Sequence, residues 1–489
     1  MSRVTDEPHA TGPAAGDGHA GPKPAETNAF RTAPSNVPQS AALPTSAQSA
    51  RPTAPRQPDE RPVTRWVTPT GWRLIGLVGS VGVAVAGTRP VGLVGVAVLA
   101  GAWLALRKVT SFRWMLVTAG LWALPLLLAP PLFSGDAMAY ACQGELVAHG
   151  LSPYQHGVAD LPCRWLDRVP ALWWHTPTPY GPLWVAVTGA AAAAGNLWVA
   201  VGVLRLVALA GIALAVGFGR RLGPNPAWLA GAGPLVLLHG VSGAHNDALL
   251  AGLVVAGLAL AMDARWGLVA GALLGLAVAV KVTALVAVPF AALYVARRRA
   301  WAGVAAGAAA AFAAVTAATG LGLGWLPALS HTAGLTQWTS PPTGVGMAAG
   351  YLLRAAGRQD LVSGAVAVAR AAGLLALAVV LAWLWWRPRP WSAGAALAAT
   401  ALLGPAFYPW YALPALAVLA AAPLSGRVRG RLGLGVAGLA LLVLPNGDGL
   451  AAMTKPVGAV LDVVLVTAVL VGLVRRHRGD RATPTPTAR

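Results

Sequence analysis

The segment from residue 131 to 180 contains the residues whose types and spacing best fit a chemical reaction. It is polar and rich in proline, and it follows a long hydrophobic stretch. Asp136 lies near its start, where the chain should leave the lipid bilayer. A carboxylate in that position costs free energy unless it is paired, hydrated or functional. We predict that Asp136 is a general base; the alternative is that it only stabilises the positive end of a helix.

The same segment should contain a short helix that begins near Gly135, behind the capping residue Ser134, and ends at Gly150. Its polar side chains recur three or four residues apart and therefore share faces. One face carries Asp136, Tyr140 and Gln143, and another carries Glu145 and His149. This pattern predicts an amphipathic helix that lies along the outer membrane surface.

A second polar group is the run His245, Asn246 and Asp247 in GAHNDALL, at a boundary between two apolar stretches. One of these residues could simply cap a helix, but three consecutive polar groups exceed what a cap needs. Lys281 stands alone in GLAVAVKVTALVAV. Its ammonium group is equally suited to binding a phosphate and to reaching the membrane interface along its aliphatic stem.

Aromatic side chains gather at the same boundaries: Trp165, Trp173, Trp174, Tyr180, Trp184, Trp325, Trp338, Tyr408, Trp410 and Tyr411. Most of them should belong to the aromatic belt at the membrane–water interface. Trp338 and Trp410 are candidates for stacking against a sugar ring. The chain has no glycine-rich nucleotide loop, no HExxH motif and no GxSxG motif.

Composition places these segments in a helical membrane protein. Of the 489 residues, 56% are hydrophobic and 11% are charged, whereas soluble domains carry about 25% charged residues. Apolar runs close to the roughly 20 residues needed to cross a bilayer recur along the chain. The net charge of +20 lies in short arginine and lysine clusters between those runs. Such clusters mark cytoplasmic loops beside anionic lipid, rather than a surface for nucleic acid.

We expect apolar helices near residues 71–87, 90–106, 114–130, 183–195, 197–219, 226–243, 247–262, 266–280, 282–296, 300–326, 361–386, 391–407, 409–423, 431–446 and 456–474. If the short run 183–195 is re-entrant, every basic cluster falls on one side of the membrane. That assignment predicts about 14 spans, with both termini inside and the loop 131–180 outside. Residues 1–65 should form a disordered cytoplasmic tail, 66–475 the membrane domain, and 476–489 a second cytoplasmic tail.

Cys142 and Cys163 are the only cysteines, and both lie in the large loop. An extracytoplasmic location permits a disulfide between them, and two unpaired thiols fit the sequence equally well. A metal site at these cysteines is less well supported, because no CxxC or Cys/His spacing is present.

Several segments resemble the polyprenol-phosphomannose-dependent α-1,6-mannosyltransferases of actinobacteria: SGDAMAYACQGELVAHGLSPYQHG, TPTPYGPLW, GAHNDALLAGLVVAGLALA, AVAVKVTALVAVPF and GPAFYPWYALP. The resemblance implies an all-α polytopic membrane protein of the GT-C glycosyltransferase class. It further implies about 13–15 transmembrane helices and a large first extracytoplasmic loop that carries short amphipathic helices. Tyr408 departs from the family pattern, in which a histidine precedes Pro-Trp-Tyr, and the cysteine pair is not a family feature.

The resemblance also implies a reaction. Mannose would move, with inversion, from a polyprenyl-phosphate-mannose donor to an α-1,6-mannan or lipoglycan acceptor outside the cell membrane. Asp136 matches the general base proposed for the family, while Lys281 and His245 would bind the donor phosphate. The remaining substrate-binding candidates are Tyr140, Gln143, Glu145, Tyr154, His156, Asn246, Asp247, Trp338, Tyr408 and Trp410.

Two further expectations concern cofactors and competing functions. The sequence indicates no cofactor with certainty, and a divalent metal ion is compatible with it although no carboxylate cluster demands one. The alternative function is that of a polytopic transporter or lipid-linked sugar flippase, in which the intramembrane charges form a substrate path. Against that alternative, the charged residues fall on one face of the membrane, and no inverted internal repeat is found.

Overall fold

The computed structural model describes residues 67–482, except residues 162, 224–225 and 295–297. The predicted N-terminal tail and the last seven residues lie outside this part of the chain. Within it the fold is all-α: helices and short loops account for the chain, with one isolated β-bridge between Val443 and Gly449. The prediction of an all-α polytopic membrane protein of the GT-C type is confirmed.

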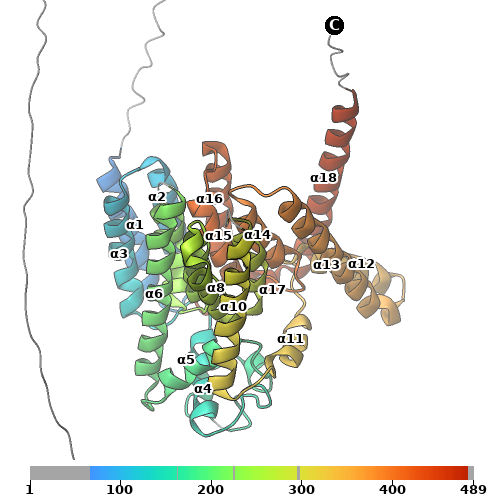
Figure 1. The fold of residues 1–489 in the computed structure, drawn as a ribbon. Helices are drawn as coiled ribbons and strands as arrows, with labels where there is room; N and C mark the ends of the chain where they lie inside the picture. Colours follow the sequence, from blue (N-terminus) through green and yellow to red (C-terminus); the bar gives the residue numbers. More distant parts are fainter. Residues whose placement is uncertain (1–66, 162, 224–225, 295–297, 483–489) are drawn as a thin grey trace, which may run out of the picture. The chain divides into compact units, whose positions relative to one another are not determined.

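The first half of the helices comprises α1 (Pro69–Ala86), α2 (Gly92–Ala105), α3 (Phe112–Leu128), α4 (Asp136–Ala148), α5 (Pro182–Ala192), α6 (Leu197–Leu222), α7 (Asp247–Ala261), α8 (Gly267–Val280) and α9 (Ala287–Tyr294). The second half comprises α10 (Arg298–Thr319), α11 (Trp325–Ala333), α12 (Pro341–Ala355), α13 (Val362–Trp386), α14 (Ser392–Leu403), α15 (Leu413–Ala421), α16 (Gly426–Ala440), α17 (Leu450–Met453) and α18 (Lys455–Ala482). Helices α1, α2 and α3 pack together, and α12 packs against both α13 and α18 (Figure 1).

Five helices of the described chain are long and apolar enough to cross a membrane: Pro69–Ala86, Leu197–Leu222, Trp301–Thr319, Gln359–Trp386 and Lys455–Arg475. A sixth span arises if the bent pair Val236–Ser242 and Asp247–Ala261 counts as one. Several shorter apolar helices pack among them. The number of spans predicted from the sequence, 13–15, therefore stays a prediction.

Several of the predicted helical runs differ from the structure, among them 226–243, 300–326 and the final run. The run 226–243 is broken into two π-helical segments, η4 (Ala227–Gly231) and η5 (Val236–Ser242), because Pro234 cannot donate a backbone hydrogen bond. The run 300–326 ends at Thr319, since Gly320 and Gly322 adopt positive φ angles of 66° and 61°. The final run continues past its predicted end, to Ala482.

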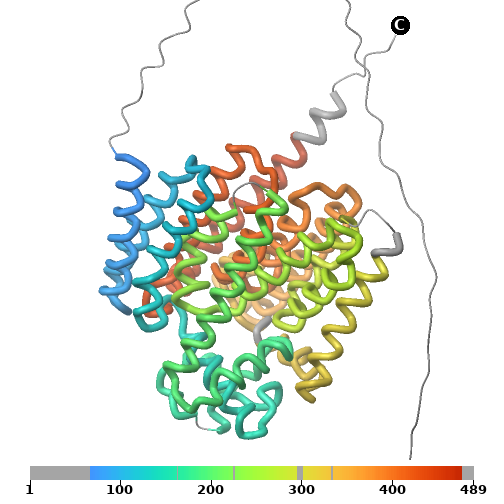
Figure 2. Tube along the Cα trace, turned by 60° about the vertical axis from the view of Figure 1, so that its left-hand side comes forward, coloured from blue at the N-terminus to red at the C-terminus, as the bar shows by residue number. Residues whose placement is uncertain are grey.

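The loop helix, α4, begins and ends close to where the sequence predicts. However, residues 136–146 are all buried, so it is not the surface helix with one exposed face that the polar spacing suggested. It packs closely against α5, where Gly144 meets the backbone carbonyl of Thr188 and a side chain would collide. Figure 2 shows the segment between α3 and α6 gathered at the end of the helix bundle opposite the start of α1.

Cys142 and Cys163 are joined by a disulfide, which ties α4 to the loop that follows it. Replacing both residues with alanine should lower the free energy of unfolding by about 3 kcal/mol, because the open chain between them gains conformational entropy. Thermal unfolding of the purified protein in detergent, with and without reductant, would measure this change. Equal stability of the double variant and the unreduced wild type would contradict the prediction.

Candidate functional site

Asp136 is held at the first turn of α4 by neighbours from two directions. Its backbone N–H donates to the Ser134 hydroxyl at 3.0 Å, and the Trp173 indole donates to its Oδ1 at 2.9 Å. The other carboxylate oxygen lies 3.6 Å from Nδ1 of His245. Only 7% of the residue surface is exposed, so the carboxylate is nearly enclosed and positioned by specific partners.

Burial also changes the acidity of this carboxylate. Desolvation raises the pKa of Asp136 to about 6, although the hydrogen bond from Trp173 and the positive charge of Lys281 oppose the rise. A carboxylate with such a pKa is ionised at neutral pH and yet basic enough to accept a proton. The environment therefore suits Asp136 to general base catalysis.

His245 lies at the bend between η5 and α7, where the chain turns by 107°. The preceding residue, Ala244, has a positive φ of 50°. Phe133, three residues before Asp136, has a φ of 65°. These are the non-glycine residues with positive φ in the described chain, and such conformations cost free energy. The strain is thus located at the two chain segments that bring His245 to Asp136.

Lys281 interrupts the chain between α8 and η7 (Val282–Val286), where its backbone is extended. Its ammonium group donates to both carboxylate oxygens of Asp247, at 2.9 and 3.1 Å. It also lies 3.9 Å from the centre of the Tyr411 ring. Lys281 is therefore paired and largely buried, unlike the solitary, interface-seeking lysine that the sequence allowed.

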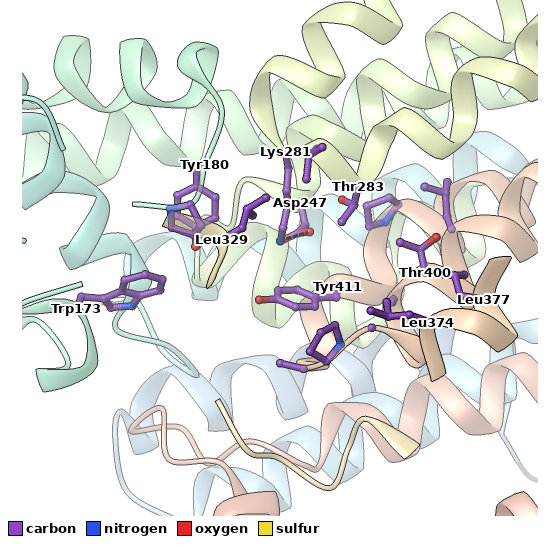
Figure 3. Close-up of a pocket in the computed structure, with 18 residues that line it drawn as sticks. Trp173, Tyr180, Asp247, Lys281, Thr283, Leu329, Leu374, Leu377, Thr400 and Tyr411 are labelled. Atoms are coloured by element: carbon purple, nitrogen blue, oxygen red, sulfur yellow. Dashed lines mark hydrogen bonds and ion pairs between the residues drawn. The ribbon is translucent and has the colours of Figure 1, made fainter. Parts of the chain in front are cut away.

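A cavity of about 340 Å³ adjoins this ion pair. In Figure 3, Trp173 and Tyr180 lie on one side of the cavity, and Lys281 and Asp247 lie near its middle. The other side is lined by apolar residues of α13 and α14, among them Leu374 and Leu377 of α13 and Leu397 of α14. The cavity therefore has a polar, charged region continuous with an apolar one.

The apolar region reaches the outer surface of the helix bundle. Leu374 lines the cavity and is still 48% exposed, on a helix whose apolar stretch is almost wholly exposed. In a membrane protein such an exposed apolar surface faces lipid. The polar region connects to Asp136 through Trp173, which lines the cavity and donates a hydrogen bond to the carboxylate.

Aromatic rings form a stack that includes His245, the neighbour of Asp136. The rings of His245 and Trp410 are stacked with centroids 4.2 Å apart, and Tyr408 stacks on the other side of Trp410 at 4.8 Å. Tyr140 approaches His245 edge-on at 6.5 Å. The structure therefore brings together the predicted residues Asp136, Tyr140, His245, Tyr408 and Trp410, while Asp247 and Lys281 form the neighbouring pair.

Other predicted substrate-binding residues have partners elsewhere. The carboxylate of Glu145 accepts from the Arg164 side chain at 2.7 Å and from its backbone N–H at 3.2 Å, which makes it a structural ion pair of the loop. His156 pairs with Asp160 at 3.4 Å and is partly exposed. These contacts place both residues outside the group around Asp136, and their assignment to sugar binding stays a prediction.

Three further candidates also fall outside the group. Tyr154 is buried in a small apolar cluster with Val185 and Trp325. The Trp338 indole donates to Thr454 at 3.2 Å, beside the start of α18. Gln143 is buried and accepts a hydrogen bond from Thr178 at 3.3 Å. Because α4 is enclosed on all sides, the i, i+7 spacing alone does not bring Gln143 into the group around Asp136, and its role in substrate binding stays a prediction.

Three side chains at the bend have no hydrogen-bond partner among the described residues. They are Asn246, through both amide atoms, and His239 and His245, through both ring nitrogens, and all three are buried. Buried polar groups in proteins usually have a partner, whether protein, water or a bound ligand. His239 was not among the predicted residues; the only signal was a histidine inside the apolar run VLLHGVS. Trp173 and Tyr411, predicted as membrane-belt aromatics, instead contact Asp136 and Lys281.

Metal ligands are not gathered at this site in the way a metal centre requires. No group of three or more His, Cys, Asp or Glu side chains with suitable placement occurs within the part of the chain that the structure describes. The site therefore contains a base (Asp136), an ion pair (Lys281 and Asp247) next to a cavity with a polar and an apolar region, and the stack of His245, Trp410 and Tyr408.

Two family models match the chain. The first, described as "Alpha-(1->6)-mannopyranosyltransferase, N-terminal domain", covers residues 64–297, and the second, "MptB C-terminal domain", covers residues 342–474. The acid, the bend and the ion pair all lie inside the first match. Tyr408 and Trp410 of the aromatic stack lie inside the second match.

Individual relatives agree with the family models. Alpha-(1->6)-mannopyranosyltransferase A of Mycobacterium tuberculosis is 36% identical over 368 residues, which cover 68% of this chain and 70% of the relative. A probable alpha-(1->6)-mannopyranosyltransferase of Mycolicibacterium smegmatis is 32% identical over 462 residues, which cover 81% of each. No solved structure matches the chain.

Proposed function

We propose a donor, a mechanism and a side of the membrane for this chain, which belongs to the alpha-(1->6)-mannopyranosyltransferase family. Membership of that family makes it a mannosyltransferase. The proposed donor is mannose linked through phosphate to a polyprenol. The proposed acceptor is an α-1,6-linked mannan or lipoglycan at the extracytoplasmic face of the cell membrane.

The observation that supports this donor is the two-part cavity. A polyprenyl-phosphate sugar has a long apolar tail, one phosphate and a polar sugar, in that order. The cavity presents apolar side chains of α13 and α14, then the ammonium group of Lys281, and then Trp173 beside Asp136. Tail, phosphate and sugar can therefore occupy the cavity in sequence, with the sugar nearest the base.

Asp136 supplies the base in the proposed reaction. The acceptor hydroxyl oxygen attacks the anomeric carbon of mannose while its proton passes to the Asp136 carboxylate. The bond from the anomeric carbon to the phosphate oxygen breaks, and polyprenyl phosphate leaves with the bonding electrons. Attack opposite the leaving group inverts the anomeric centre, which converts a β-mannosyl phosphate into an α-linkage.

Lys281 is proposed to stabilise the charge that develops on the departing phosphate. Two of its donors are directed to Asp247, and an ammonium group has a third. His245 was expected to share this role, but it does not line the cavity and lies beside Asp136 instead. We assign it to orienting the base; its 3.6 Å separation is long for a hydrogen bond and can shorten when substrate binds.

The test is a transfer assay with the purified full-length protein in proteoliposomes. Labelled mannosyl phosphopolyprenol and a short α-1,6-mannoside should give a product longer by one α-1,6-linked mannose, whereas GDP-mannose in place of the lipid donor should give none. Product formed from GDP-mannose would overturn the proposed donor. Movement of the labelled lipid across the bilayer without product would indicate the flippase alternative.

The raised pKa of Asp136 predicts the pH dependence of the reaction. The base works as the carboxylate, so kcat/KM should be constant above pH 6 and fall by about tenfold per pH unit below about 6 as the group is protonated. Steady-state rates between pH 4.5 and 8 would show this limb. A limb near the ordinary carboxyl pKa of about 4 would contradict the proposed environment.

A further inference from the structure

A second cleft lies between α12, α13 and α18 and has a volume of about 580 Å³. It shares no lining residue with the donor cavity, although both lie along α13. Three cationic side chains line it, one from each helix: Arg354, Arg370 and Lys455. Its other polar lining residues are uncharged, and no aspartate or glutamate is among them.

The position of these cations is unusual for the chain. Helix α13 ends beside Arg387 and Arg389, and α18 carries Arg475 toward its far end, in keeping with the basic clusters of one membrane side. Arg370 and Lys455 belong to the opposite halves of the same two helices. The rule that places basic residues on the cytoplasmic side therefore does not account for this group.

The cleft is bordered by surfaces that face lipid. The apolar stretches of α13 and α18 are only 6% and 17% buried. Val368 on α13 and Val460 on α18 are both at least 60% exposed, near the cleft. Acyl chains lying on these faces would place a lipid headgroup at the cations. The Arg370 guanidinium donates hydrogen bonds to the Thr343 hydroxyl at 3.0 Å and to the Leu335 carbonyl at 2.6 Å. These bonds fix the position of its positive charge in the lining of the cleft.

We propose that this cleft binds the phosphate of an anionic phospholipid, with the acyl chains on the exposed faces of α13 and α18. Asp360 is paired with Arg358 at 3.2 Å and does not line the cleft. Asp462 of α18 is buried against Gly344 of α12 and does not line the cleft either. The cleft therefore offers cationic side chains at lipid level with no carboxylate in its lining, which is the chemistry that recognises a lipid phosphate.

The test uses native mass spectrometry of the full-length protein in detergent, titrated with phosphatidylglycerol or phosphatidylcholine. The wild type should bind phosphatidylglycerol preferentially, and the Arg354→Gln/Lys455→Gln variant should bind it about thirtyfold more weakly, since two cations are lost. Arg427→Gln/Arg429→Gln on α16 is the matched control, because it removes the same charge from a basic cluster elsewhere and should bind as the wild type does.

A charge-preserving variant separates binding from folding. Arg354→Lys/Lys455→Arg should keep the affinity for phosphatidylglycerol, and loss of affinity in this variant would overturn the proposal. Unchanged affinity in the glutamine variant, or an equal loss in the α16 control, would also overturn it. Glycerol 1-phosphate should fail to displace the lipid; displacement at equal concentration would show a site for a soluble phosphate rather than a lipid.

Discussion

Replacing Asp136 with asparagine should lower kcat for mannosyl transfer by about 10²- to 10⁴-fold, the range typical of losing a general base. Asparagine has nearly the same volume and can still accept the hydrogen bond from Trp173, which now goes to Oδ1 of the acid. The fold should therefore survive while proton removal from the acceptor is lost. Initial rates at saturating donor and acceptor would measure the change.

Asp167→Asn is the matched control for this experiment. Asp167 is an exposed acid of the same loop and lies outside the donor cavity, so its loss should leave kcat unchanged. Turnover of Asp136→Asn at the wild-type rate would remove Asp136 from the mechanism. An equal loss in both variants would show that the loop as a whole, and not this carboxylate, supports activity.

Replacing Lys281 with methionine should have two effects, because the lysine is proposed to bind phosphate and is paired with a buried acid. Breaking a buried ion pair from one side costs about 3–5 kcal/mol of stability, since the remaining charge is left without compensation. The carboxylate left behind would be Asp247, which is 2% exposed. The KM for the lipid donor should rise as well. Thermal unfolding and donor titration would measure the two effects separately.

The variant Lys281→Met/Asp247→Leu distinguishes the two roles of the lysine. With both charges replaced by apolar groups, stability should return toward that of the wild type, because no buried charge is left unpaired. Use of the phosphopolyprenol donor should stay impaired, since no cation faces its phosphate. Recovery of transfer together with stability would contradict phosphate binding and leave the pair a structural role only.

The local features of the site region follow from the sequence. The capping residue, the polar spacing and Gly150 predicted a helix close to the observed α4, which spans Asp136–Ala148. The two cysteines of the loop permitted the disulfide that the structure contains, but two unpaired thiols fitted the sequence equally well. The helix prediction depends on residues close together in the chain, where the backbone itself limits the distance between side chains.

The partners of the polar residues did not follow from the sequence. Glu145 is also a carboxylate on the same helix as Asp136, but it pairs with Arg164, whereas Asp136 meets an indole and an imidazole. The helical periodicity predicted separate polar faces on α4, but α4 is buried on all sides, so these faces do not separate exposed from buried side chains. Residue type and spacing gave no information about the burial that raises the pKa of Asp136.

The sequence by itself determined the class of this protein, because lipid solvation requires long apolar helices and composition alone reveals them. It also indicated the family and the acid at the start of the large loop. Only the tertiary structure decided that this acid lies beside His245 and that Lys281 pairs with Asp247. The physical reason is that both contacts arise where helices break or bend, at the strained turn before His245 and at the extended Lys281. The geometry of such breaks is set by packing between distant segments, which no local pattern encodes.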